Sequence, residues 1–367
     1  MIEKIRICNF RSIIDETVEL SPLTVLIGRS GTGKSNFIRA VRFLRDFLLK
    51  AAEHSASDQP FARVDSVLSY DVTFRIRGIP SSLRYSILIK GNRNNVMAEK
   101  FMNGEQVVFH QENGKWVELP PGISAEPPGR QIALGAFPSL SIAVNAFVAL
   151  THGIGVYEFP LGVLKKSHDS KDQSLGDQGE NFLPTLLALT TNLNDLPAKQ
   201  RLTALLHQID PSVSAFELNS ITNPSAAIVT HALGNQLFEI PLSNESEGMR
   251  RFIAHVVALK QIRTKQTVFF EEPEIGIYPG AFHLLCDEIK QFVEQGLGQI
   301  VLTTHSPGLL DNFDVDTLRV VHKAESGTTI TRISAEQVES VKEGLLTTGE
   351  LLAVDPARPE LPVEAAP

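Results

Sequence analysis

The segment "LTVLIGRSGTGKSN", residues 23–36, decides the fold. Its apolar start, 23–27, is typical of a buried central strand. Residues 28–35 fit the pattern G-x-x-x-x-G-K-[ST], and residues 35–50 carry apolar side chains at helical spacing. Glycines let successive backbone N–H groups face a phosphate, and the N-terminus of a helix favours the same anion. We therefore predict a strand, a phosphate-binding loop (P-loop) and a helix. In such a loop Lys34 contacts the β- and γ-phosphates, and Ser35 binds Mg²⁺.

Two carboxylates follow a second apolar run in "QTVFFEEPE", residues 266–274. Beside a P-loop, Glu271 can hold Mg²⁺ through water, and Glu272 can polarise the attacking water as a general base. The alternative for these residues is a solvated acidic turn that ends a strand. Glu274 suits a structural role or an interface role equally well.

A histidine follows the next apolar run, in "QIVLTTHSP", residues 299–307. His305 comes one helix and one strand after Glu272, so in a parallel sheet both lie at the same carboxyl edge. There His305 can hydrogen-bond the γ-phosphate or the attacking water. The alternative is a structural histidine, which is how we interpret the other nine histidines.

The segment "NESEGMRRFIAHVVAL", residues 244–259, begins an amphipathic helix with Ser246, Glu247 and Gly248. These residues can cap the helix, or they can form an anion site at its N-terminus. If they do not serve their own nucleotide, they can serve that of a partner subunit. On the helix after the P-loop, Arg39, Arg42 and Arg45 form either a basic patch or, as we favour, a solvated face.

Composition and charge narrow the class of protein. The chain has 367 residues, a net charge of −8 and two cysteines, Cys8 and Cys286. The acidic charge does not indicate non-specific nucleic-acid binding, and two distant cysteines do not indicate a disulfide framework. There is no signal-peptide pattern at the N-terminus and no apolar run long enough to span a membrane. We expect a cytoplasmic protein.

The chain is expected to divide into five parts. Residues 1–60 hold a strand pair, the P-loop and a helix of the core. Residues 61–135 form an antiparallel β lobe, 136–235 a mainly helical insertion, and 236–350 the second part of the core. Residues 351–367 are rich in Pro and Ala and are expected to be disordered.

These segments, in this order, resemble the ABC-class ATPases, and within that class the OLD-like and SMC/RecF-like group. "IRICNFRSI" with the P-loop, "FFEEPEIGIYP", "TTHSPGLLD", "GVYEFP" and "SLGDQGENFLPTLLAL" carry the resemblance. It implies an α/β fold: a P-loop ABC-type head with an antiparallel β subdomain and a helical insertion. It also implies ATP and Mg²⁺ as cofactors and a homodimer, or a higher homo-oligomer, formed through the ATP sites.

The resemblance assigns roles residue by residue. Glu271 is the Walker B acid and metal residue, Glu272 the catalytic base, and His305 the switch histidine. Ser246 and Gly248 form the signature segment, which reaches the γ-phosphate of the partner subunit, and Arg250 belongs to that interface. The residues implied to bind ATP in the loop are Gly28, Arg29, Ser30, Gly31, Thr32, Gly33, Lys34, Ser35 and Asn36.

Three departures from the group stand out. The signature segment reads "ESEGMR" rather than LSGGQ, Tyr278 stands where the group often has a histidine, and Glu271 occupies a position often held by aspartate. Gln131 is a candidate for the Q-loop glutamine. No segment after His305 is long enough for the TOPRIM nuclease domain of full OLD nucleases.

The resemblance implies a slow ATPase that dimerises around ATP and switches a separate effector, a nuclease or a toxin, in bacterial anti-phage defence. The alternative is a RecF/SMC-like DNA-binding ATPase in repair or recombination. The long separation between P-loop and signature argues against a transporter ATPase. Glu272 and His305 argue against an inactive ATP-sensing scaffold.

Overall fold

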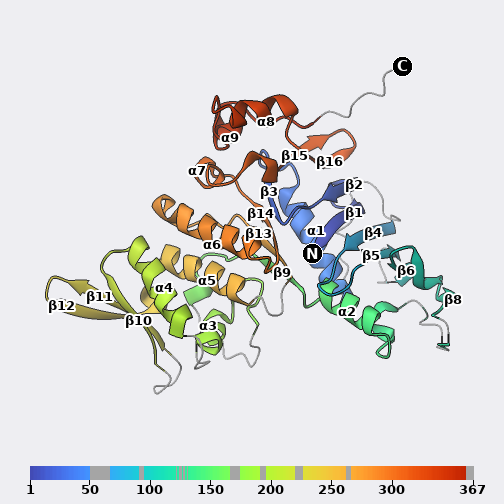
Figure 1. The fold of residues 1–367 in the computed structure, drawn as a ribbon, viewed down its shortest axis with the longest axis horizontal. Coiled ribbons are helices and arrows are strands. Elements are labelled where there is room, and N and C mark those ends of the chain that lie inside the picture. The colour runs from blue at the N-terminus through green and yellow to red at the C-terminus, as the bar shows by residue number, and fades with distance from the viewer. Residues whose placement is uncertain are drawn as a thin grey trace.

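The computed structural model describes residues 1–49, 67–90, 95–120, 122–123, 126, 129, 131–165, 174–190, 196–219, 226–261 and 266–360. Within these ranges the chain forms three β-sheets with helices between and beside them (Figure 1). The helices are α1 (Lys34–Leu48), α2 (Ser141–Leu150), α3 (Phe182–Thr190), α4 (Leu196–Ile209), α5 (Glu247–Lys260), α6 (Phe282–Glu294), α7 (Pro307–Leu310), α8 (Ala335–Lys342) and α9 (Glu350–Ala353).

A six-stranded sheet in the order β16-β15-β3-β14-β13-β9 forms the core. All neighbours in it pair in parallel except the hairpin of β15 with β16. Side chains alternate between its two faces, so that Phe269 joins one hydrophobic core while Val268 and Phe270 join the other. Its strands are β3 (Leu23–Ile27), β9 (Ile154–Tyr157), β13 (Thr267–Glu271), β14 (Gln299–Thr303), β15 (Leu318–Ala324) and β16 (Gly327–Thr331). The buried strand predicted at 23–27 and the helix after it are confirmed as β3 and α1.

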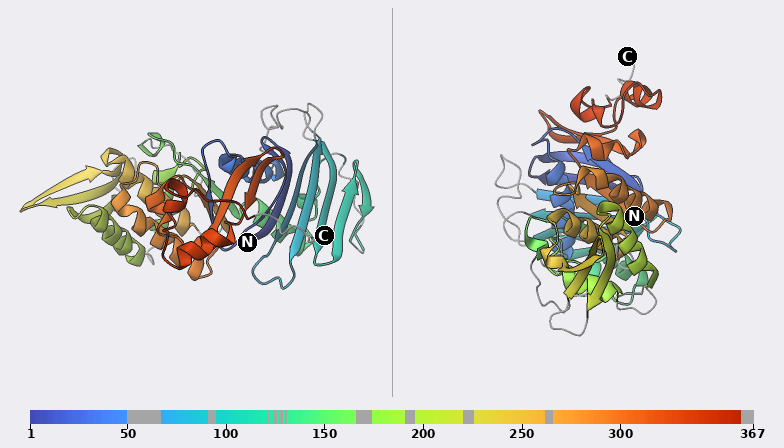
Figure 2. Two further views of the ribbon diagram at one scale, coloured as in Figure 1. Left: turned by 90° about the horizontal axis from the view of Figure 1, so that it is seen from above. Right: turned by 90° about the vertical axis from the view of Figure 1, so that its left-hand side faces the viewer.

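A seven-stranded antiparallel sheet, in the order β2-β1-β4-β5-β6-β7-β8, lies beside the core sheet (Figure 2). Its strands are β1 (Ile2–Phe10), β2 (Ile13–Glu19), β4 (Val67–Phe74), β5 (Leu83–Lys90), β6 (Asn95–Asn103), β7 (Gln106–Glu112) and β8 (Lys115–Glu118). The N-terminal strand pair is confirmed as β1 with β2. Helix α1 packs between the two sheets, since the Phe37 ring lies 6.5 Å from that of Phe269 and the Phe43 ring 6.4 Å from that of Tyr70. The P-loop helix thus joins both parts of the molecule.

The segment predicted to be mainly helical, 136–235, contains strands as well as α2, α3 and α4. Strand β9 joins the core sheet, while β10 (Val213–Asn219), β11 (Ala226–Leu233) and β12 (Gln236–Pro241) form a three-stranded sheet that projects at one end of the molecule (Figures 1 and 2). This part of the segment is a sheet rather than helices because its strands pair with one another: β11 is hydrogen-bonded to β10 on one side and to β12 on the other.

The tail predicted to be disordered, 351–367, needs a correction for its first ten residues. Leu351 is fully buried in α9, the N–H of Ser334 donates to the carbonyl of Arg358, and the N–H of Glu360 donates to the carbonyl of Arg332. These contacts hold 351–360 against the core, because buried apolar area and backbone hydrogen bonds outweigh the Pro-rich composition. Residues 361–367 lie outside the described residues.

Candidate functional site

The P-loop connects β3 to α1, and its glycines are required by geometry. Gly28 and Gly33 have φ of 150° and 115°, which disfavours any L side chain. A Cβ at Gly28 would clash with the carbonyl oxygen of Val321, and one at Gly33 would clash with the side chain of Thr328. The β15–β16 hairpin therefore packs directly against the loop, which only glycine at these two positions permits.

Lys34 is buried at the start of α1, and its Nζ donates to the carbonyls of Gly28 at 2.8 Å and Arg29 at 3.1 Å. Burial lowers the pKa of Lys34 to about 8, and the carboxylates of Glu272, Glu274 and Glu271 act in the opposite direction. The ammonium group is thus close enough to all three carboxylates for their negative charge to raise its pKa. A site of this kind attracts an anion that can replace the two carbonyl contacts.

The end of β13 presents the two predicted acids. Glu271 is the last residue of the strand, and its Oε2 is buried without a hydrogen-bond partner among the described residues. Glu272 has φ 47°, a left-handed conformation that costs about 1–3 kcal/mol in a residue other than glycine. Its N–H donates to Thr303 Oγ1 on β14 at 3.1 Å. This backbone turn separates the directions of the two carboxylates.

His305 follows β14 and lies close to Glu272 and Glu274, which follow β13. Its Nε2 lies 3.6 Å from Glu272 Oε1. Glu274 Oε1 accepts hydrogen bonds from Thr304 Oγ1 at 2.7 Å and from the N–H of His305 at 2.9 Å. Burial, and then the charge of Lys34, lower the pKa of His305, while burial raises that of Glu274. Glu274 therefore holds the histidine loop in place, a role that the sequence left open between structure and interface.

Asn36, which the resemblance implies to bind ATP, has a side-chain hydrogen bond with the turn between β1 and β2. Its Nδ2 donates to Ser12 Oγ at 2.7 Å, and Ser12 Oγ lies 2.7 Å from Thr328 Oγ1. Thr328 Oγ1 in turn donates to the carbonyl of Thr32 at 2.9 Å. Ser12, in the turn between β1 and β2, and Thr328, on β16, brace the P-loop from far away in sequence, so the motif alone contained no signal for them.

The signature segment lies at the N-terminus of α5 and contacts the segment after β13. Ser246 caps the helix by accepting from the N–H of Met249 at 3.2 Å. A Cβ at Gly248 would press on the carbonyl of Gly276, and Arg251 Nη1 donates to the carbonyl of Ile275 at 2.8 Å. The signature segment and the segment 272–278 are therefore one connected surface.

Arg250 was predicted to belong to an interface, and its guanidinium turns inward. Its Nη2 donates to Glu247 Oε2 at 2.6 Å and its Nη1 to the carbonyl of Ser243 at 3.0 Å. In the described part of the chain, the side-chain hydrogen bonds of Ser246 and Arg250 join residues of the signature segment and the residues just before it. Glu247 also accepts a hydrogen bond from the N–H of Gly162. None of these hydrogen bonds is with the P-loop.

Arg42 and Arg45 of α1 do not form a solvated face, which corrects the prediction for these two of the three arginines. Arg45 is buried and donates to both carboxylate oxygens of Asp177, at 2.8 and 2.6 Å, while Arg42 Nε lies 3.2 Å from Asp177 Oδ2. A long-range ion pair of this kind leaves no trace in helical periodicity. Gln131, the Q-loop candidate, is exposed, and its carbonyl accepts from Gln111 Nε2.

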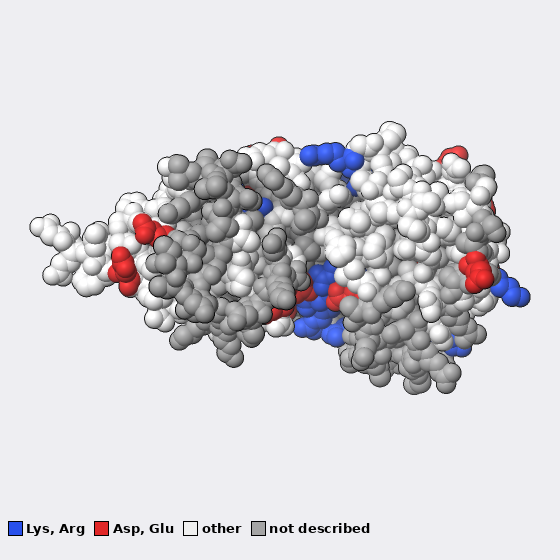
Figure 3. All heavy atoms as spheres, turned by 90° about the horizontal axis from the view of Figure 1, so that it is seen from below, with Lys and Arg blue, Asp and Glu red and all other residues white. Residues whose placement is uncertain are grey.

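The face of the molecule in Figure 3 shows how charge is distributed. On its described part, Lys and Arg side chains form no continuous band, and a group of them lies beside acidic side chains at the middle of the face. None of the helices in the described ranges combines the length and apolarity of a membrane-spanning helix.

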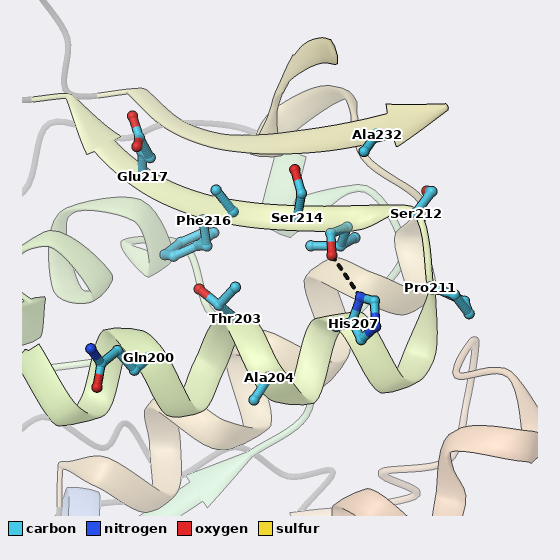
Figure 4. Close-up of a pocket in the computed structure, with 12 residues that line it drawn as sticks. Gln200, Thr203, Ala204, His207, Pro211, Ser212, Ser214, Phe216, Glu217 and Ala232 are labelled. Atoms are coloured by element: carbon cyan, nitrogen blue, oxygen red, sulfur yellow. Dashed lines mark hydrogen bonds between the residues drawn. The ribbon is translucent and has the colours of Figure 1, made fainter. Parts of the chain in front are cut away.

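A separate cavity of about 660 Å³ lies between α4 and β10 (Figure 4). His207 on α4 points to the backbone of β10, where its Nδ1 lies 2.8 Å from the carbonyl oxygen of Val213. None of the residues predicted to bind ATP lines this cavity. The residues predicted to bind ATP and to hydrolyse it follow β3, β13 and β14 instead.

Known proteins share both the site segments and the fold. Residues 1–116 match the family model described as "AAA ATPase domain", and residues 158–311 match "AAA domain, putative AbiEii toxin, Type IV TA system". The Old nuclease of Escherichia phage P2 is 23% identical over 93% of this chain, and the OLD nuclease of Thermus scotoductus is 21% identical over 94%. The matches span 62% and 66% of the length of these relatives.

The chain is an AAA ATPase related to the OLD nucleases. The solved head domain of SMC bound to the C-terminal winged-helix domain of ScpA is similar over 92% of the ATPase and 99% of that chain, with TM-score 0.57 and 15% identity. An SMC head from Pyrococcus furiosus with an extended coiled coil is similar over 94% of the ATPase and 99% of that chain, with TM-score 0.55 and 12% identity. These similarities confirm the predicted fold of an ABC-type head with an antiparallel sheet.

Proposed function

We propose that the ATPase dimerises head to tail around ATP and that closing and opening of this dimer switches a separate effector. One observation carries the proposal. Three strand ends bring the P-loop, Glu272 and His305 to one edge, whereas the signature segment is connected to 272–278 and not to the P-loop of its own chain. A nucleotide bound by one copy therefore lacks signature contacts unless a second copy supplies Ser246 and Gly248.

The surface beside the signature segment supports a subunit interface. Ile275 and Tyr278 are 44% and 71% exposed, although both are large and apolar or aromatic. Exposed aromatic and apolar side chains next to polar functional residues are typical of interaction sites. In the proposed dimer these residues are covered by the P-loop side of the partner.

The residues of the edge fit Mg²⁺ together with ATP. Glu271, whose Oε2 has no hydrogen-bond partner among the described residues, and the hydroxyl of Ser35 would hold Mg²⁺ through oxygen atoms, the ligands that this ion prefers. When bound, Mg²⁺ neutralises charge on the β- and γ-phosphates. Lys34 holds the same phosphates through its ammonium group, and the backbone N–H groups from Gly28 to Ser35 surround them.

Glu272 acts as the general base in this proposal. Its carboxylate polarises a water for attack on the γ-phosphate, and the largely neutral ring of His305, 3.6 Å away, orients that water or the phosphate. The geometry in a single chain is only half of the site, so we expect slow hydrolysis that depends on dimerisation.

We place this switch in bacterial anti-phage defence, with a nuclease or a toxin as effector. The match to a family model named after the AbiEii toxin and the similarity to a phage P2 nuclease support this assignment. The net charge of −8 and the lack of a continuous basic band on the described part of the face in Figure 3 disfavour the alternative of a DNA-binding repair ATPase.

The test is ATP turnover and sizing of the wild type, Glu272→Gln and, as a matched control, Glu294→Gln at the exposed end of α6. We expect Glu272→Gln to turn over ATP at least about 10²-fold more slowly and to remain as an ATP-bound dimer. Glu294→Gln should behave like the wild type. If Glu272→Gln hydrolyses ATP at the wild-type rate, Glu272 is not the base; tight, salt-sensitive DNA binding by the ATP-bound dimer would favour the repair alternative instead.

A further inference from the structure

A second pocket lies beside β3, and its lining includes Leu20 and Ser21, which precede this strand, whereas the P-loop follows it. It has a volume of about 380 Å³ and opens between the strands β1 and β4 of the antiparallel sheet and the β15–β16 hairpin of the core. None of the residues of the P-loop lines this pocket. The residues that line the pocket are Glu3, Lys4, Glu19, Leu20, Ser21, Thr73, Arg319 and Arg332.

Two arginines face each other in this pocket. Arg319 lies on β15, and Arg332 comes directly after β16. Val320 pairs with Thr331, so the next step of the same antiparallel register sets Arg319 opposite Arg332. Side chains at opposite positions of such a pair point to the same face, with Cβ atoms about 5 Å apart, and like charges there are destabilising.

Among the described residues these two arginines have no ion-pair partner, although carboxylates lie near Arg319. Arg319 is 8% exposed, and its Nη1 donates only to the backbone carbonyls of Asp316 and Leu318. In the described ranges no carboxylate forms an ion pair with Arg319 or Arg332. Burial, and then the charge of Arg332, lower the pKa of Arg319, while the carboxylates of Glu19, Asp316 and Glu360 act in the opposite direction.

The two acidic side chains of the pocket have other partners. Glu3 Oε1 lies 2.6 Å from Arg75 Nε, and Glu3 Oε2 accepts from Ser82 Oγ at 2.7 Å. Glu19 Oε1 lies 3.8 Å from Lys4 Nζ. The lining has three basic side chains and two acidic ones, and this surplus of positive charge favours an anion from solution.

We propose that this pocket is a binding site for a small phosphorylated ligand, whose phosphate group is held between Arg319 and Arg332. Paired guanidinium groups match the planar, bidentate geometry that phosphate oxygens accept. A pocket of this volume has room for a phosphate and a small substituent, and the hydroxyls of Ser21 and Thr73 can contact that substituent. The site is independent of ATP hydrolysis and of the proposed dimer.

The test measures binding of inorganic phosphate and of AMP by calorimetry to the Lys34→Ala protein, whose P-loop has lost its phosphate-binding lysine. We expect saturable binding of at least one of the two ligands, weakened at least about tenfold by the additional change Arg332→Ala. The matched control is Lys323→Ala, which removes one exposed charge from the same hairpin outside the pocket. It should leave the affinity unchanged.

Arg332 is exposed, so its removal should not prevent folding, and Arg319→Gln provides a second variant inside the pocket. Comparing phosphate with AMP distinguishes a free phosphate ion from a phosphomonoester. The proposal is overturned if neither ligand binds, or if Arg332→Ala and Arg319→Gln both bind as tightly as their parent. It is also overturned if a short single-stranded oligonucleotide binds in an Arg332-dependent manner while phosphate and AMP do not.

Discussion

Lys34 combines burial with a charge that the proposed ligand requires. Its ammonium group donates hydrogen bonds to two carbonyl oxygens. Its pKa is about 8 because burial lowers the pKa more than three nearby carboxylates raise it. A triphosphate adds several negative charges around the same nitrogen and favours its charged form. Proton binding by Lys34 is therefore coupled to nucleotide binding.

We predict that ATP binding at about pH 8.5 takes up a fraction of a proton, because burial lowers the pKa of Lys34 to about 8 and the bound phosphates favour its charged form. The sign follows from the lowered pKa: affinity is highest below pH 8 and falls as the pH rises above it. Calorimetry in buffers of different ionisation enthalpy measures the uptake.

Lys34→Arg is the control for this proton uptake, since an arginine stays charged throughout this pH range. The variant should bind ATP, with lower affinity, without taking up a proton. Equal uptake by the wild type and Lys34→Arg would show that another group is responsible.

At the scale of single residues, the sequence predicted the groups that lie within contiguous motifs. Lys34, Glu272 and His305 come to one edge because each follows a buried strand of a parallel sheet. The partners that hold these groups are distant in sequence, and their contacts exist only after folding. Asn36 donates a hydrogen bond to Ser12, 24 residues away, and Arg45 pairs with Asp177, which is 132 residues away, rather than with water.

At the scale of elements, α5 is held at its N-terminus by a buried network that reaches the three-stranded sheet. The Nε2 atom of His231 on β11 lies 2.8 Å from Glu245 Oε1, and its Nδ1 atom lies 2.7 Å from Ser212 Oγ. Glu245 directly precedes Ser246, the N-cap of α5. The network therefore positions the signature segment from an element that lies outside the core sheet.

We predict that His231→Ala destabilises the protein by about 3 kcal/mol, because it leaves the buried carboxylate of Glu245 without its partner. The double change His231→Leu with Glu245→Leu should cost less, since it removes both polar groups. Thermal unfolding without nucleotide compares these variants with His283→Ala, an exposed histidine of α6. If His231→Ala unfolds at the wild-type temperature, the network does not hold α5.

Long elements with clear periodicity were predictable, and elements defined by their neighbours were not. The residues of β6 include Ala98, Glu99 and Lys100, which have low strand propensity, yet β6 is paired on both sides. Glu99 is buried because Tyr85, Gln111 and two backbone N–H groups donate to it. The hairpin β11–β12 did carry a local signal, the Gly-Asn turn at 234–235, which the helical interpretation of this region passed over.

At the scale of the whole molecule, two hydrophobic cores share the six-stranded sheet between them. One core lies between this sheet and the antiparallel sheet and contains α1, and the other contains α5 and α6. The P-loop helix and the signature helix thus lie on opposite faces of one sheet. A second copy that turns its signature face toward the P-loop of the first completes two sites at once by two-fold symmetry.

Mixing two inactive variants tests this composite site most directly. Lys34→Ala removes the P-loop function and Ser246→Arg blocks the signature segment, so each variant alone should be inactive. In a mixed dimer one site contains both defects and the other site contains none. Random pairing makes about half of the dimers mixed, and each mixed dimer has one intact site of two, so the mixture should restore roughly a quarter of the wild-type ATP turnover. A mixture of Lys34→Ala with the double variant Lys34→Ala/Ser246→Arg should restore none. If Ser246→Arg alone is fully active, or if mixing restores no activity, the two halves of the site do not come from two copies of the chain.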